Sequence, residues 1–195
     1  MMKQELDQSR IELSVKLKNG ANFLLAGSIL WIPIALMWAL QPDVVINCWS
    51  TLAFGGFVSP LALLLGRLWK IPNSLKGNPL NPVPFMLNFG QFLYYPLFLL
   101  IIYTSPEHFP LVLATVTGAH LLPFAWPYKC RLFFVFPPVM VAGVALLFLL
   151  AQEAFFAIPA FMCAATGALA CFLFRDAEKK RAAWDGPKEG AGQII

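Results

Sequence analysis

A polar stripe runs along the apolar segment between residues 85 and 104. Asn88, Gln91 and Tyr95 are spaced at i, i+3 and i+7, which places them on one face of a helix, with Tyr94 beside them. Amide and phenol groups in hydrocarbon need partners, so we predict that this face points toward protein. The pattern leaves two interpretations open, the wall of a polar cavity and hydrogen bonds that hold neighbouring helices together.

His120 is the other group that could do chemistry inside an apolar segment. It lies about ten residues beyond Pro110, a depth of roughly 15 Å in a helix. A histidine there can relay protons or hydrogen-bond a solute, or it can bond a neighbouring helix, for example at Tyr95. We predict that His120 faces the bundle interior near the midplane, within reach of a partner. Together with the stripe it defines a candidate polar cavity.

Several kinds of chemistry find no support. No Asp or Glu lies deep in an apolar segment, and the HExxH, GxSxG and Walker patterns are missing from the sequence. One deep histidine without a carboxylate or a second histidine is a poor metal site, so we predict no metal and no cofactor. The lack of a nucleophile with a base favours a protein that is not an enzyme, although the sequence does not decide this.

The composition indicates which solvent surrounds these groups. Of 195 residues, 59% are hydrophobic and only 12% are charged, and the mean hydropathy is +0.69. A soluble domain needs roughly a quarter of its residues charged to cover its surface. We therefore predict an all-α, polytopic membrane protein. The net charge of +4 is spread over short loops, which indicates contact with anionic headgroups of membrane lipids and not with nucleic acid.

Six apolar segments are long enough to span a bilayer, at about 20 residues each. They are residues 21–41, 44–69, 85–104, 110–128, 132–150 and 154–174. Each contains an internal proline, and we expect kinks where a backbone donor is lost. The prolines are Pro33, Pro60, Pro96, Pro123, the pair Pro137-Pro138, and Pro159.

The basic residues predict the orientation. With the N-terminus in the cytoplasm, the inner segments are 1–20, 70–84, 129–131 and 175–195. These hold every Lys and Arg of the fourteen except Arg67, which lies at the inner end of the second segment. The outer loops carry Asp43, Glu107 and Glu153. We predict a multi-pass protein of the cell inner (plasma) membrane with both termini cytoplasmic.

This orientation divides the chain into three parts. Residues 1–20 form a short amphipathic cytoplasmic segment, for which we favour a helix on the membrane surface. Residues 21–174 form the six-helix transmembrane domain. Residues 175–195 form a basic cytoplasmic tail, disordered from Asp185 onward. The proline-rich loop at 70–84 is interpreted as a rigid linker.

Two stretches carry a resemblance to a known family. IELSVKLKNGANFLLAG at 11–27 and GAHLLPFAWPYKCR at 118–131 resemble a small uncharacterised bacterial family of six-helix integral membrane proteins, a domain of unknown function. The resemblance covers nearly the whole chain. It implies the six-span topology and draws attention to His120, but it implies no mechanism.

Three hypotheses of function follow. The first is a small transporter or channel-like protein for a small or amphipathic solute, with a cavity lined by Asn88, Gln91, Tyr94, Tyr95 and His120. The second is a non-catalytic membrane scaffold or accessory subunit. The third is a lipid-handling membrane enzyme. The sequence leaves open a homo-oligomer and the identity of any substrate.

Overall fold

The protein is an elongated bundle of helices, described here from a computed structural model over residues 2–151 and 154–184. No strand occurs in these two ranges. Six helical segments are long and apolar enough to cross a membrane, which confirms the predicted all-α fold. We call them the first to sixth spans: Lys18–Leu40, Val44–Leu68, Pro82–Thr104, Pro106–Ala125, Leu132–Leu150 and Ala157–Ala182.

Three of the spans are built around one long helix, and three are broken into shorter pieces. The long helices are α2 (Ala21–Leu40), α8 (Leu132–Leu150) and α9 (Ala157–Ala182). The second span consists of α3 (Val44–Gly56) and α4 (Val58–Leu68). The third consists of α5 (Pro82–Phe89), the 3-10 helix η2 (Gly90–Tyr94) and α6 (Tyr95–Thr104). The fourth consists of η3 (Pro106–His108), α7 (Phe109–His120) and η4 (Leu122–Ala125).

The prolines explain several of these breaks. Pro60 and Pro96 lie in the first turns of α4 and α6, where a backbone N–H has no partner within the helix and its loss costs little. Pro123 lies in η4. Pro33 and the Pro137-Pro138 pair instead lie inside α2 and α8. Some of the prolines therefore begin a new helix, while others interrupt the hydrogen bonding of a continuous one.

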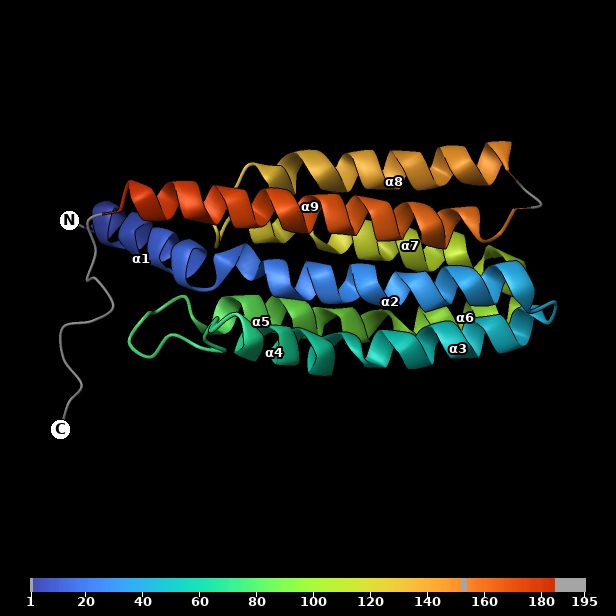
Figure 1. Ribbon diagram of the computed structural model, residues 1–195. Helices are drawn as coiled ribbons and strands as arrows, with labels where there is room; N and C mark the ends of the chain where they lie inside the picture. The colour runs from blue at the N-terminus through green and yellow to red at the C-terminus, as the bar shows by residue number, and fades with distance from the viewer. Residues whose placement is uncertain (1, 152–153, 185–195) are drawn as a thin grey trace.

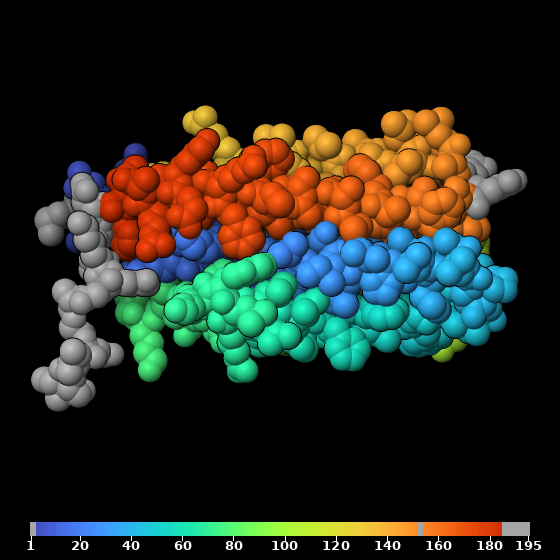
Figure 2. Space-filling model, in the orientation of Figure 1, coloured from blue at the N-terminus to red at the C-terminus, as the bar shows by residue number. Residues whose placement is uncertain are grey.

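The centre of the bundle is the contact between α2 and α9, the most extensive pair of helices in the fold (Figures 1 and 2). Gly167 on α9 permits the close approach, because a Cβ there would lie only 2.8 Å from Oγ of Ser28 on α2. The Ser28 hydroxyl donates to the backbone carbonyl of Cys163, at 2.8 Å. A small residue facing a hydroxyl that bonds across the interface is typical of membrane helix packing.

The charged residues separate to the two ends of the bundle. α1, the loop between α4 and α5, the segment before α8 and the end of α9 all lie at one end (Figure 1). These parts carry the basic residues of the described chain, except Lys18 in the turn after α1 and Arg67 in the last turn of α4. Asp43 lies at the other end, where its carboxylate accepts hydrogen bonds from the backbone N–H groups of Val45 and Ile46 and caps α3. Glu153, Lys188 and the predicted disordered tail from Asp185 lie outside the described residues.

The N-terminal helix is held against the bundle. α1 (Met2–Lys16) packs against α9 and follows the long axis of the bundle instead of crossing its end (Figure 1). Leu13 and Val15 are buried, which accounts for this placement. The loop at 70–84 also folds onto the bundle: Ile71, Leu75 and Leu80 are buried, and the Asn78 amide donates to the Ser9 carbonyl and the Glu12 carboxylate.

Candidate functional site

Two neighbouring cavities lie within the bundle. Their walls come mainly from the first four spans, together with Phe133 of the fifth and Thr166 of the sixth. The larger, of about 270 Å³, lies toward the basic end, and we call it the amide cavity because Asn19, Asn22, Asn73, Asn81 and Asn88 are among its walls. The smaller, of about 220 Å³, extends from it, and we call it the central cavity. The two share Phe23, Leu24, Ser59, Asn88, Phe92 and Leu121. No charged residue lines either cavity in the described chain.

The breaks of the three discontinuous spans meet at the central cavity. Its walls include Gly56 and Ser59 at the joint of α3 and α4, Gln91 in η2, and Leu121 between α7 and η4. Pro60 has no N–H to offer the carbonyl of Gly56, so the helix ladder is interrupted at the cavity wall. In membrane proteins, broken helices are tolerated where the backbone is buried in protein or lines a hydrated cavity.

Three of the five predicted site residues come together. Asn88, Gln91 and Tyr95 all line the central cavity, and Asn88 also lines the amide cavity. Their side-chain amides and phenol form no hydrogen bond with another described residue, and the same is true of Ser59 and Thr117 beside them. The cavity therefore offers polar groups whose hydrogen-bonding capacity is not used by the protein.

Tyr94 does not join them. It is 41% exposed and lines neither cavity, although it precedes Tyr95 directly. Successive residues of a helix point in different directions, and η2 ends at Tyr94 while α6 begins at Tyr95. Tyr94 therefore lies on the outer surface of the third span.

His120 is also separate from the cavities. It is the last residue of α7, five positions before the span ends at Ala125, and so lies nearer the basic end than predicted. Its ring packs edge-on against Phe124, with the centroids 5.4 Å apart. The Nε2 atom is buried and finds no hydrogen-bond partner in the described chain. The structure does not supply the predicted helix partner.

The asparagines near the basic end are cavity residues that the sequence analysis missed. The Asn22 amide donates to the carbonyl of Ala62 at 3.0 Å and joins α2 to α4. The Asn81 side-chain oxygen accepts from the backbone N–H of Leu75 at 2.7 Å and shapes the loop before α5. Their signal was present in the asparagine-rich stretches KNGAN and NPLNP, which lie far apart in the sequence.

Asn19 anchors the turn between α1 and α2, in the 3-10 helix η1 (Lys18–Gly20). Lys18, Asn19 and Gly20 have φ values of 50°, 54° and 70°, a left-handed run that favours Asn and Gly. Gly20 also allows a close approach, because a Cβ there would lie 3.1 Å from the Tyr128 hydroxyl. The fully buried Asn19 amide donates to the Leu173 carbonyl and to Asp176, each at 3.0 Å.

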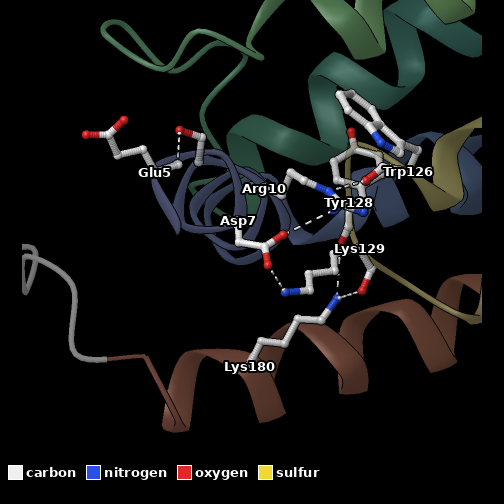
Figure 3. Close-up of polar contacts among 8 residues, drawn as sticks. Glu5, Asp7, Arg10, Trp126, Tyr128, Lys129 and Lys180 are labelled. Atoms are coloured by element: carbon white, nitrogen blue, oxygen red, sulfur yellow. Dashed lines mark hydrogen bonds and ion pairs between the residues drawn. The ribbon is translucent and has the colours of Figure 1, made fainter. Parts of the chain in front are cut away.

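Beyond this turn, α1 is bound to the segment before α8 (Figure 3). Arg10 Nε donates to the carbonyl of Trp126 at 2.7 Å, and its guanidinium lies 5.2 Å from the centre of the Trp126 ring. Asp7 accepts from Arg10 and forms an ion pair with Lys129, at 3.2 and 3.0 Å. The hydrogen bond from Lys129 lowers the pKa of the Asp7 carboxyl below its ordinary value.

Lys180 on α9 joins the same cluster from the other side (Figure 3). Its ammonium donates to the carbonyls of Tyr128 and Lys129 at 3.0 and 3.1 Å, and to the Ser14 hydroxyl at 3.0 Å. Burial raises the pKa of the Tyr128 phenol and raises that of the Cys130 thiol to about 11. Both groups are therefore neutral at physiological pH, which argues against a reactive thiolate or phenolate here.

These contacts bring together the two stretches that carry the family resemblance, residues 11–27 and 118–131. The first supplies Ser14 and the turn at Asn19, and the second supplies the carbonyls of Tyr128 and Lys129 that face them across Lys180. Although far apart in the sequence, they form one structural unit at the basic end. This unit closes the amide cavity, since Asn19, Gly20 and Tyr128 all belong to its wall.

The fold and the cavities define a class: a six-helix bundle of the kind expected for a multi-pass integral membrane protein, with uncharged internal cavities and no assembled catalytic or metal site in the described residues. Residues 6–176 match a family described as "Family of unknown function (DUF7010)", and the chain belongs to that family. Searches of curated proteins and of solved structures give no match.

Proposed function

We propose that this membrane protein is a small transporter or channel-like protein that passes a small, uncharged solute through its two cavities. The observation that carries the proposal is the set of unused polar groups: Asn88, Gln91 and Tyr95 line one cavity and form no hydrogen bond within the described chain. All three side chains are only half-buried, so their polar groups are open to the cavity. Polar groups within the membrane need hydrogen-bond partners, so water or a solute is the expected partner.

The broken helices support the same proposal. In many transporters, discontinuous helices surround the binding site, because their interrupted backbones offer additional polar groups there. Here the joints of the second, third and fourth spans adjoin the central cavity. A non-catalytic scaffold, the alternative hypothesis, has no need of such an arrangement.

The proposed orientation places the basic end in the cytoplasm, with both termini on that side. Cytoplasmic loops of membrane proteins are enriched in Lys and Arg, and anionic headgroups of the inner leaflet attract them. At this end, Arg67 lies in the last turn of α4, and Lys70 and Lys76 lie in the loop between α4 and α5. A reporter fused after Ile195 that is accessible from outside intact cells would contradict this placement.

Vesicle swelling tests passage through the cavities. Purified protein in phosphatidylcholine vesicles should increase the permeability to uncharged urea and glycerol, but not to choline. The double substitution Asn88→Leu with Gln91→Leu should return the permeability to that of empty vesicles. Tyr94→Phe is the matched control, because Tyr94 lies on the same span and outside both cavities. Native protein that leaves swelling unchanged would favour the scaffold hypothesis.

A further inference from the structure

The cavities share their walls with the outer apolar surface between α4 and α5. Phe85, Phe89 and Phe92 of the third span line the amide cavity and are nevertheless 71%, 59% and 57% exposed. Leu63 on α4 lines the same cavity from the other side and is 38% exposed. The same side chains thus border the interior space and the apolar surface of the bundle.

The packing explains why a gap remains at this place. Over its apolar stretch, the third span has the smallest share of buried residues of the six, 11% against 39% in the fourth and the sixth. α4 packs against α2, whereas α5 packs against η2 and η4. The rings of Phe85, Phe89 and Phe92 contact one another in sequence, with centroids 6.2 and 5.4 Å apart, and form a continuous aromatic edge.

The wall chemistry limits what can enter. Asn88 and Gln91 provide amides and Ser59 provides a hydroxyl, all uncharged, while the remaining wall is mainly apolar and aromatic. A charged headgroup would lose its hydration here without gaining an opposite charge, which is costly. A neutral headgroup with hydroxyls or an amide can instead form hydrogen bonds with the free side chains. A hydrocarbon chain suits an aromatic edge that faces lipid.

We propose that the cavities take a neutral amphiphile, with a hydroxyl or amide headgroup and a hydrocarbon chain, which enters sideways from the bilayer between α4 and α5. This inference rests on the proposed function, since it names the class of solute and its route into the same cavities. The headgroup lies against Asn88 and Gln91, and the chain extends past Phe89 toward lipid.

Photo-crosslinking in vesicles tests the route and the class of ligand together. The probes are a diazirine-bearing monoacylglycerol and the free fatty acid with the same chain, each in phosphatidylcholine vesicles at pH 8. The monoacylglycerol should label residues 59–63 and 85–92, mapped by mass spectrometry, and the anionic fatty acid should not. Asn88→Leu with Gln91→Leu should reduce labelling about tenfold, the effect of two lost hydrogen bonds.

Two further variants guard against trivial results. Leu93→Ala removes a side chain that is 79% exposed and lines neither cavity, so labelling at the cavity should remain. Gly55→Phe is the second test variant, for use if the double variant fails to fold. It places a ring in the central cavity from a position where an added Cβ meets no atom within 4 Å, and it should also reduce labelling. Equal labelling by both probes that does not change when Asn88, Gln91 and Gly55 are substituted would indicate ordinary contact with lipid. That result would overturn the inference.

The photo-crosslinking and swelling experiments can fail independently, so they test lateral entry and solute passage separately. Labelling that depends on Asn88, without any passage of urea or glycerol, would support lateral entry and contradict solute passage from water. Passage that depends on Asn88, without labelling by the monoacylglycerol, would support the proposed transport and overturn lateral entry.

Discussion

The Asn19 side-chain amide donates a hydrogen bond to the Asp176 carboxylate at 3.0 Å, across 157 positions of sequence. The same amide group also donates to the carbonyl of Leu173. Asn19 therefore joins the beginning of the first span to the end of the sixth. It does so from a left-handed backbone conformation, with φ of 54°.

Asn19→Ala should be strongly destabilising for two reasons. It leaves buried polar partners unsatisfied, at about 1–3 kcal/mol, and it replaces an asparagine, which tolerates the left-handed conformation, with an alanine, for which that conformation costs about 1–2 kcal/mol. Asn19→Gly keeps only the first penalty, so it should be less destabilising than Asn19→Ala by roughly 1 kcal/mol. Unfolding by SDS titration in mixed micelles measures both. If Asn19→Ala were as stable as the native protein, Asn19 would not anchor the first span to the sixth.

Lys180→Met should loosen the segment before α8. The carbonyls of Tyr128 and Lys129 lose their donor, and Asp176 loses an ion pair at 2.7 Å, so the free energy of unfolding should fall by about 1–3 kcal/mol. Lys179→Met is the control, because Lys179 is an exposed neighbour on the same helix, and its effect should stay within about 0.5 kcal/mol. Equal effects of the two variants would show that only the charge matters.

Two glycines on the central helices should respond in opposite ways to alanine. Gly167→Ala forces a Cβ to within 2.8 Å of Ser28 Oγ and should cost about 1–3 kcal/mol as α2 and α9 move apart. Gly27→Ala adds a Cβ that meets no atom within 4 Å, and it should be neutral or stabilising by up to about 1 kcal/mol. Thermal unfolding of the purified variants in detergent compares them. A destabilised Gly27→Ala would mean that the cavity wall cannot accept even a methyl group.

The ion pair of Asp7 and Lys129 predicts a pH dependence. The pKa of Asp7 is lower in the folded protein than its ordinary value of 3.8, so the pair stabilises the fold fully above about pH 5. This contribution is lost as the pH falls through the folded pKa. The difference in unfolding temperature between the native protein and Asp7→Asn should be small, since the pair is exposed, and should vanish between pH 5 and pH 2. A difference that stays constant over this range would contradict the assignment.

The spans were predictable because their signal is local. Apolar runs and basic loops define all six, and the ends agree to within a few residues for most of them. The sixth extends further, to Ala182, because the charged residues after Arg175 favour a helix and its partners on α1 hold it there. The third begins at Pro82, three residues before the apolar run, because proline suits the first turn of a helix.

The candidate site was predictable only in part, for a physical reason. The stripe of Asn88, Gln91 and Tyr95 was predictable because helical periodicity can be recognised within a single segment of sequence. The cavity wall contributed by Asn22 and Ser59 depends on which spans are neighbours, and no local pattern specifies this. His120 seemed central because of its distance from Pro110, but the span begins four residues earlier and α7 ends at His120.

The pairing of α2 with α9 has a consequence for how the protein is made. Ser28 and its acceptor Cys163 are 135 positions apart, which at ribosomal rates is a delay of about 7 to 27 seconds. During this time the first span leaves the ribosome without its main partner and must be sheltered by lipid or by the insertion machinery. The beginning of α1 and the end of α9 lie at the same end of the bundle, so a circular permutant with α9 ahead of α2 is sterically accessible (Figure 1). In that permutant the two central helices would be synthesised in succession, and the delay would disappear.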